Sequence, residues 1–134
     1  FLQWLTQYRN VLHDQKIAIE DCCIVGSASL EVHGLRQSTD IDFTTRSAIR
    51  ADHFGPGVTH FEGGVDLVTE GYHKSEQGEH WSDDVLIDQP GLHVYFRGFK
   101  MADIAVIRDR KRFSKRPKDL LDVELINRLT EGAD

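Results

Sequence analysis

The sequence predicts an α/β domain, and three observations carry that prediction. Residues 22–45 read in order as an apolar strand, a Gly-Ser turn, a short helix, a polar loop and a second strand. Apolar residues recur at helical spacing near both ends of the chain, in residues 2–15 and 118–129. Short apolar runs bounded by glycine add further strands in the middle of the chain. Strands that alternate with helices are typical of an α/β fold.

The predicted elements of the first half follow from apolar spacing and from chain breakers. In order, they are a helix (2–15), a connector (17–20), a strand (22–25), a helix (27–33), a strand (41–45), a helix (47–53) and a strand (58–61). Gly34 is expected to end the second helix, because glycine readily takes the left-handed conformation that follows a helix. The Phe-Gly-Pro-Gly cluster at 54–57 is expected to end the third.

The second half is predicted in the same way. Its elements are a strand (65–69), a polar loop (71–84), a short strand or turn (85–87), a hairpin of 93–96 with 100–101, a helix (102–111) and a last helix (118–129). Pro117 fits the first position of the last helix, where its missing N–H is not needed. The apolar residues of that helix are expected to form its buried stripe: Leu120, Leu121, Val123, Leu125, Ile126 and Leu129.

The composition is that of an ordinary globular protein. Its 134 residues fit one domain, residues 1–134, with a single core. No apolar run approaches membrane-spanning length, so no membrane contact is expected. Cys22 and Cys23 are neighbours in a predicted strand, where alternation sends their side chains to opposite faces. We expect two buried thiols in a reducing compartment, and hence a cytoplasmic protein. The chain starts at Phe1 without a Met, which leaves open whether upstream sequence is missing.

Positive charge is concentrated in one segment of an acidic chain. The net charge of −6 argues against a protein that binds nucleic acid over its whole surface. Residues 108–118 nevertheless hold seven cations and one acid, Asp109. The cations are Arg108, Arg110, Lys111, Arg112, Lys115, Arg116 and Lys118. This basic run is either a solvated stretch between helices or a positive rim that gathers a nucleotide or a polynucleotide.

The turn and the second strand point to phosphate and metal chemistry. Gly26 lets the backbone approach a ligand closely, and the amides that follow Ser27 at the start of a helix favour a phosphate. Asp40 and Asp42 are two residues apart in a predicted strand, so both carboxylates are expected on the same face of the sheet. The alternative is a pair of solvated carboxylates at the exposed start of a strand. A phosphate-binding turn that faces paired carboxylates is what metal-assisted phosphoryl chemistry requires.

These residues carry a family resemblance. Gly26-Ser27, twelve intervening residues and Asp40-Ile41-Asp42 together resemble the signature of the nucleotidyltransferase superfamily that includes DNA polymerase beta. Residues 34–39, Gly-Leu-Arg-Gln-Ser-Thr, look like the family's Gly-x-Arg-x-Ser approach to the acidic pair. The stretch is most similar to small stand-alone prokaryotic or phage members, some of them linked to toxin–antitoxin systems. The resemblance implies a minimal nucleotidyltransferase fold, with a short mixed sheet flanked by helices mainly on one face.

The resemblance also implies a metal site. Asp40, Asp42 and Asp66 would hold two Mg²⁺ ions, with Mn²⁺ as an alternative, and Asp66 would complete the site and deprotonate the acceptor. Asp66 interrupts an otherwise apolar strand, where a carboxylate usually has a partner or a cation. The other interpretation of Asp66 is a residue on an edge strand that faces solvent. In that case Glu62 or Asp103 would be the third carboxylate of the metal site.

The implied activity is a metal-dependent transfer of a nucleoside monophosphate from an NTP to a hydroxyl acceptor, with release of pyrophosphate. The nucleotide-binding residues would be Gly26, Ser27, Arg36, Ser38 and Lys118. Lys118 opens a Lys-Asp-x-x-Asp run that looks like one in several small bacterial nucleotidyltransferases, where the acids serve largely as helix N-terminal stabilisers.

Three features of the function stay open at this point. The acceptor is a small molecule, a protein or an RNA end, and a partner protein or a homo-oligomer is not excluded. A second hypothesis is a non-catalytic nucleotide-binding, RNA-binding or toxin–antitoxin interaction module that kept the fold. Clustered carboxylates argue against that hypothesis, because a binding module has no need for charges that repel one another.

Overall fold

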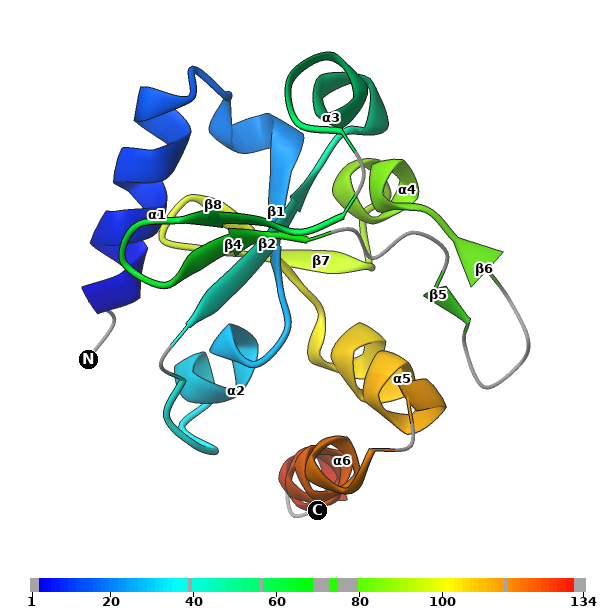
Figure 1. Cartoon of the computed structure of the whole chain (residues 1–134). Helices are drawn as coiled ribbons and strands as arrows, with labels where there is room; N and C mark the ends of the chain where they lie inside the picture. The colour runs from blue at the N-terminus through cyan, green and yellow to red at the C-terminus, as the bar shows by residue number, and fades with distance from the viewer. Residues whose placement is uncertain are drawn as a thin grey trace.

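A six-stranded mixed sheet with the order β3-β4-β2-β1-β8-β7 forms the centre of the computed structural model (Figure 1). The structure describes residues 3–38, 40–55, 57–68, 73–74, 80–114 and 116–131. The strands of this sheet are β1 (Cys22–Val25), β2 (Ile41–Thr45), β3 (Thr59–Phe61), β4 (Val65–Leu67), β7 (His93–Phe96) and β8 (Phe99–Ala102). The pairs β1–β8 and β2–β4 are parallel, and the other neighbours are antiparallel. A separate two-stranded sheet pairs β5 (His73–Lys74) with β6 (His80–Trp81).

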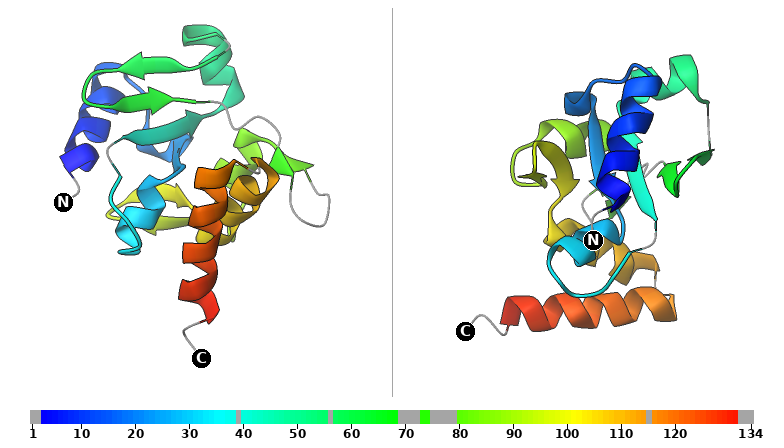
Figure 2. Two further views of the ribbon diagram at one scale, coloured as in Figure 1. Left: turned by 60° about the horizontal axis from the view of Figure 1, so that its bottom comes forward. Right: turned by 90° about the vertical axis from the view of Figure 1, so that its left-hand side faces the viewer.

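Helices cover both faces of the six-stranded sheet. They are α1 (Gln3–Asp14), α2 (Ala28–Val32), α3 (Ser47–His53), α4 (Asp83–Asp88), α5 (Ile104–Ser114) and α6 (Pro117–Glu131), with a 3₁₀ turn, η1 (Ile19–Asp21), before β1. The sequence therefore predicts an α/β fold with a mixed sheet correctly. The expectation of helices mainly on one face holds only in part, because α1 covers one face while α4 and α5 share the other. Figure 2 shows α6 lying outermost, beyond α2 and α5.

The alternation of β1 divides the apolar interior into two cores. Cys22 and Ile24 belong to the core beneath α1, with aromatic residues such as Tyr8 and Phe43. Cys23 and Val25 belong to the core beneath α4 and α5. The two cysteines thus lie on opposite faces of the sheet, as strand alternation predicts, and both are buried and outside any disulfide.

Several predicted elements differ from the structure. The helix predicted for 102–111 runs from Ile104 to Ser114, and Ala102 is the last residue of β8. Residues 85–87 are part of α4 and not a strand or turn, because Ser82 accepts a hydrogen bond from the Val85 amide and caps a helix whose Leu86 and Ile87 are fully buried. The predicted loop 71–84 ends in the first residues of α4 and contains β5 and β6. Residues 69–72 and 75–79, which include the predicted end of the fourth strand, lie outside the described residues.

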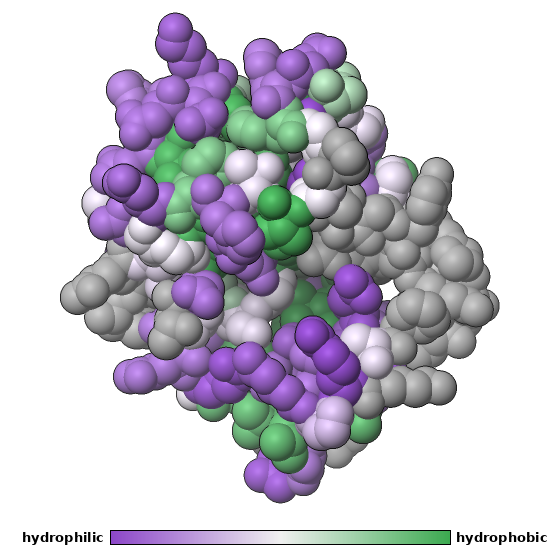
Figure 3. All heavy atoms as spheres, viewed as in Figure 1, coloured by the Kyte–Doolittle hydropathy of each residue, from purple (hydrophilic) through white to green (hydrophobic). Residues whose placement is uncertain are grey.

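The predicted stripe of α6 is wrong in detail. Val123 and Ile126 are buried, whereas Leu120, Leu121 and Leu129 are exposed. Figure 3 shows a hydrophobic patch at the lower edge of the molecule, over α6, below a strongly hydrophilic region. Pro117 is the first residue of the helix, as predicted. None of the described helices is both long and apolar enough to cross a membrane.

Candidate active site

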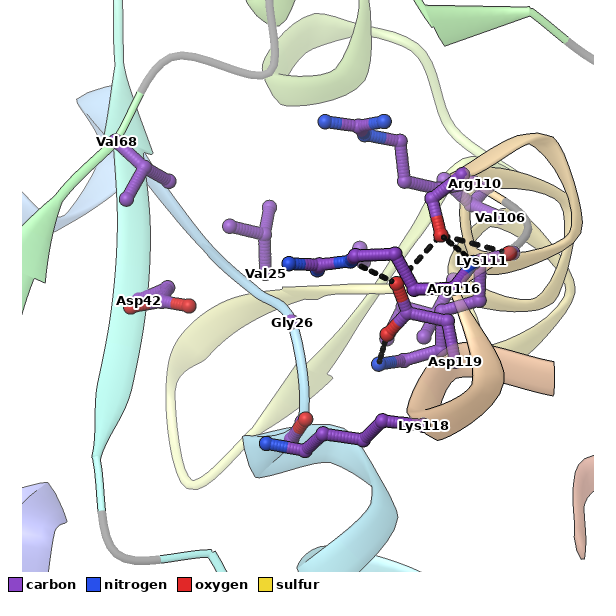
Figure 4. Close-up of a pocket in the computed structure, with 14 residues that line it drawn as sticks. Val25, Gly26, Asp42, Val68, Val106, Arg110, Lys111, Arg116, Lys118 and Asp119 are labelled. Carbon is purple, nitrogen blue, oxygen red and sulfur yellow. Dashed lines mark hydrogen bonds and ion pairs between the residues drawn. The ribbon is translucent and has the colours of Figure 1, made fainter. Parts of the chain in front are cut away.

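A cavity of ≈ 480 Å³ lies where the chain leaves β1 and turns into α2. Gly26 and Ser27 contribute from this turn, Asp42 from β2, and Lys118 from the start of α6. Figure 4 shows Asp42 on one side of the cavity, with Arg110, Lys111 and Arg116 on the other. Four of the residues predicted for the site are therefore brought together at one cavity: Gly26, Ser27, Asp42 and Lys118.

Two constraints require glycine at position 26: its backbone conformation and the nearby Asp42 carboxylate. Its φ of +73° lies in the left-handed region, which favours glycine. A Cβ at this position would lie only 3.0 Å from Oδ2 of Asp42. The turn therefore needs glycine both for its backbone conformation and to let the Asp42 carboxylate approach. The following helix, α2, has only five residues, so the side chains matter more here than the field of that short helix.

Asp42 belongs to a row of residues that runs across the sheet. Asp42 is in register with Val25 of β1 and with Asp66 of β4, and Asp66 is in register with His60 of β3. Residues in register on neighbouring strands share a face of the sheet, so the two carboxylates are adjacent on the face that also bears α4 and α5. Oδ1 of Asp66 lies 2.7 Å from Nδ1 of His60. Sequence reasoning missed His60, which is exposed and stands outside any local motif.

Asp40 lies apart from this row. It is exposed and precedes β2, which begins at Ile41, and it is absent from the described lining of the cavity. Among the described residues, no three His, Cys, Asp or Glu side chains are grouped closely enough to hold a metal ion. Of the three predicted carboxylates, Asp42 alone is in the described lining of the cavity; Asp66 is in register with it on β4, and Asp40 precedes β2. Of the substitute carboxylates, Glu62 is exposed, and Asp103 accepts from the Ala105 amide at the start of α5.

The cations of the predicted basic run have different surroundings among the described residues, and the buried Nε of Arg108 has no hydrogen-bond partner there. Lys111 is buried and contacts Asp119 at 3.2 Å and Asp122 at 2.8 Å. Arg116 is exposed and contacts Asp119 at 2.9 Å. Lys118 makes no hydrogen bond or ion pair with any other described residue, and Figure 4 shows it extending toward the segment that follows Gly26. Lys115 of the run lies outside the described residues.

Asp119 supports the cationic side of the cavity through its contacts with Lys111 and Arg116. It is buried and accepts hydrogen bonds from the Ser114 hydroxyl, at 2.5 Å, and from Arg116. Burial by itself raises the pKa of Asp119, but these hydrogen bonds and the charge of Lys111 outweigh burial and lower the pKa to about 2. The carboxylate is therefore ionised at neutral pH and holds the end of α5 against the start of α6.

Arg36 and Ser38 are placed differently from their predicted roles. The Arg36 guanidinium is engaged by Asp122, Ser27 and the Gln37 carbonyl, and Arg36 is absent from the described lining of the cavity. The hydrogen bonds to Asp122 raise the pKa of Arg36 above its ordinary value. The Ser38 hydroxyl donates to the Asp40 carbonyl at 2.6 Å. Both residues shape the loop before β2.

Asp122 makes more contacts around the site than the sequence predicts. The sequence predicts helix stabilisation for Asp122, but its carboxylate contacts two cations, Arg36 and Lys111, and is almost fully buried. The spacing of the Lys-Asp-x-x-Asp run was the available signal, because residues three apart share a helix face.

Comparison with protein-family models, with curated proteins and with solved structures gives no match for this chain.

Proposed function

We propose that the protein transfers a nucleoside monophosphate from an NTP to a hydroxyl acceptor in a metal-dependent reaction. The acceptor oxygen forms a bond to the α-phosphorus, the bond from that phosphorus to the oxygen bridging it to the β-phosphate breaks, and pyrophosphate leaves. The acceptor loses its proton to a base. This reaction class is the one that the Gly-Ser turn and the Asp-x-Asp pair imply by resemblance.

One observation carries the proposal. The Asp42 carboxylate lies against the Gly26 turn on one side of a cavity whose other side is cationic. A triphosphate is strongly anionic, so its oxygens fit the side bearing Arg110, Arg116 and Lys118. The opposite, acidic side suits the cation that accompanies a triphosphate. A cavity with this separation of charge is expected for a metal–nucleotide complex.

The donor set fits Mg²⁺, with Mn²⁺ as the alternative. Mg²⁺ is commonly bound by one or two carboxylates together with substrate phosphates and water, without an all-protein cage. Asp42 and Asp66, which are in register on neighbouring strands, would supply those two carboxylates, and Asp40, which precedes β2, is left out of this donor set. When bound, the metal would neutralise charge on the phosphates.

The protein's own residues have separate tasks in this proposal. Ser27 and Lys118 bind phosphate oxygens, and the exposed Lys118 ammonium offsets the charge of the departing pyrophosphate. Asp66 takes the acceptor proton. The catalytic effect comes from positioning and charge neutralisation, since no covalent intermediate is needed.

The test combines binding with transfer. Wild-type protein is expected to gain thermal stability with Mg²⁺ and an NTP together, and to transfer an α-phosphate label from one of the four NTPs to a component of a cell extract. Asp42→Asn should abolish transfer and the Mg²⁺-dependent part of the stabilisation, while the fold is kept. Asp52→Asn, which changes an exposed carboxylate on α3, is the matched control and should behave as wild type. Wild-type binding without transfer to any RNA, protein or metabolite would contradict the enzymatic proposal.

The alternative is a non-catalytic nucleotide-binding or RNA-binding module. It is favoured by one observation: Asp40 stands apart from Asp42 and Asp66, so that no group of three acidic side chains forms within the described residues. In that case the four NTPs bind with little dependence on Mg²⁺, and Asp42→Asn binds at least as well as wild type, because it removes a repulsive charge.

A further inference from the structure

Arg36 bridges two segments that are far apart in the sequence. Its Nε donates to Oδ1 of Asp122 at 2.8 Å, and its Nη2 donates to Oδ2 of the same carboxylate at 3.0 Å. Nη2 also donates to the Ser27 hydroxyl at 2.7 Å. Asp122 lies on α6, 86 positions after Arg36. One guanidinium therefore joins the turn after β1 to the last helix.

The bond from Arg36 determines what the Ser27 hydroxyl can do. A guanidinium has donors only, so Ser27 Oγ must act as the acceptor in that contact. The hydroxyl proton is thereby left for another partner. Because Ser27 lines the cavity, an acceptor atom held there, such as a phosphate oxygen, is its natural partner. Arg36 thus sets the position of Ser27 and makes it a donor toward the cavity.

Asp122 holds Arg36 in the geometry that this requires. Its side chain is 3% exposed, and it accepts the bidentate fork of Arg36 together with a contact from Lys111 at 2.8 Å. Burial by itself raises the pKa of Asp122, but the hydrogen bonds from Arg36 and Lys111 outweigh it and lower the pKa, so the carboxylate is ionised at neutral pH. Lys111 also contacts Asp119, which ties the same network to the basic side of the cavity.

We propose that Asp122 is a positioning residue of the phosphate site, which acts through Arg36 on the Ser27 hydroxyl and so completes the site only when α6 is docked. This inference rests on the proposed function and deepens it. Arg36 is assigned to the same relay and not to direct contact with the nucleotide. The relay is distinct from helix stabilisation, because it predicts that Asp122 and Ser27 act on ligand binding as one unit.

The experiment is a double-mutant cycle read by calorimetric titration with Mg²⁺ and inorganic tripolyphosphate. Ser27→Ala and Asp122→Asn should each weaken binding about tenfold, the effect expected from one hydrogen bond to a charged group. The double variant should also be weakened about tenfold, because both changes remove the same contact. Glu124→Gln is the matched control on α6, since the contact of Glu124 within the described part of the chain is an exposed pair with Arg128, and it should bind as wild type.

Each other outcome decides against the inference. Losses that multiply to about a hundredfold in the double variant would show two independent contributions. An Asp122→Asn variant that is less stable to heat but binds tripolyphosphate as wild type would show a purely structural role. If Asp122→Asn does not fold, Arg36→Lys serves instead: it keeps the charge but loses the fork that reaches Asp122 and Ser27 together, and it should show the same tenfold loss. Normal binding by that variant overturns the relay.

The proposed function and the relay fail in different ways. Wild-type protein that binds neither tripolyphosphate nor any NTP contradicts the proposed function, and the relay with it. Wild-type binding combined with uncoupled variants contradicts the relay alone.

Discussion

At the scale of single residues, Gly26 is the position where backbone and site constrain each other most closely. Two separate demands fall on it, a left-handed φ and the absence of a Cβ beside Asp42. Gly34 has the same φ of +73°, but a Cβ added there meets nothing within 4 Å. Comparing substitutions at Gly26 and Gly34 therefore separates the effect of the left-handed backbone from the effect of a Cβ contact with Asp42.

We predict that Gly34→Ala lowers the free energy of unfolding by about 1–2 kcal/mol, because it forces a side chain into the left-handed region, and that Gly26→Ala lowers it by at least as much, because its Cβ also meets Asp42. Only Gly26→Ala should also weaken the binding of a Mg²⁺–NTP complex, since its methyl group displaces the Asp42 carboxylate. Urea denaturation measures the first effect and titration calorimetry the second. A Gly34→Ala variant that loses as much nucleotide affinity as Gly26→Ala would contradict the assignment of the contact.

At the scale of elements, β1 and β2 could be predicted from the sequence at their observed bounds, whereas β4 covers only Val65–Leu67 of the predicted strand 65–69. The predicted strands 22–25 and 41–45 and the helix 47–53 coincide with β1, β2 and α3. Apolar runs ended by glycine or by polar residues encode such short elements locally. Local patterns also identified the Gly26–Ser27 turn and placed Asp42 beside it.

Contacts between elements that are distant in the sequence could not be predicted from local sequence patterns. The apolar residues of α6 occupy more than one side of the helix, so their spacing does not say which side packs on α5; Val123 is buried and Leu121 is 64% exposed. The register that sets Asp66 beside Asp42 depends on the pairing of β2 with β4, which follows an intervening helix and strand. The bond from Arg36 to Asp122 crosses most of the chain. Tertiary packing decides each of these.

The contact between α5 and α6 predicts an acid-sensitive stability. The native pKa of Asp119 is about 2, below the value of about 3.9 expected in the unfolded chain. The unfolded state therefore binds more protons in this interval, and stability falls as the pH drops from about 4 to about 2. Asp122, whose pKa is also lowered, contributes with the same sign.

Asp119→Asn should flatten this acid limb and should also reduce stability at pH 7, because Lys111 then stays buried with one carboxylate fewer. Val123→Ala removes buried apolar volume from the same helix without changing a charge, so it should lower stability equally at all pH values. Denaturant unfolding at a series of pH values measures both. An acid limb of unchanged slope in Asp119→Asn would show that the Asp119 contacts do not survive in solution.

At the scale of the whole molecule, one sheet serves two cores and one site. Successive residues of β1 alternate between the core under α1 and the core under α4 and α5, and the strand ends at Val25, just before Gly26. The cavity lies on the α5 side. Its lining includes the cations Arg110, Lys111, Arg116 and Lys118, although the net charge of the chain is −6. The position of Asp42 therefore depends on a sheet that neither core supports alone.

This arrangement predicts that the two cores unfold together. Leu12→Ala removes volume beneath α1, and Leu86→Ala removes volume on the opposite face; each should cost about 2–5 kcal/mol. Because the strands between the cores are shared, either change should shift one common transition and leave its denaturant dependence unaltered. Trp4 fluorescence, measured in a Trp81→Phe background where it is the sole indole, reports the α1 core, and far-ultraviolet circular dichroism reports the whole fold. The two signals should coincide in every variant. If Leu86→Ala lowers the dichroism midpoint while Trp4 keeps its wild-type midpoint, the cores are separate folding units, and the site would then depend on the α4–α5 side alone.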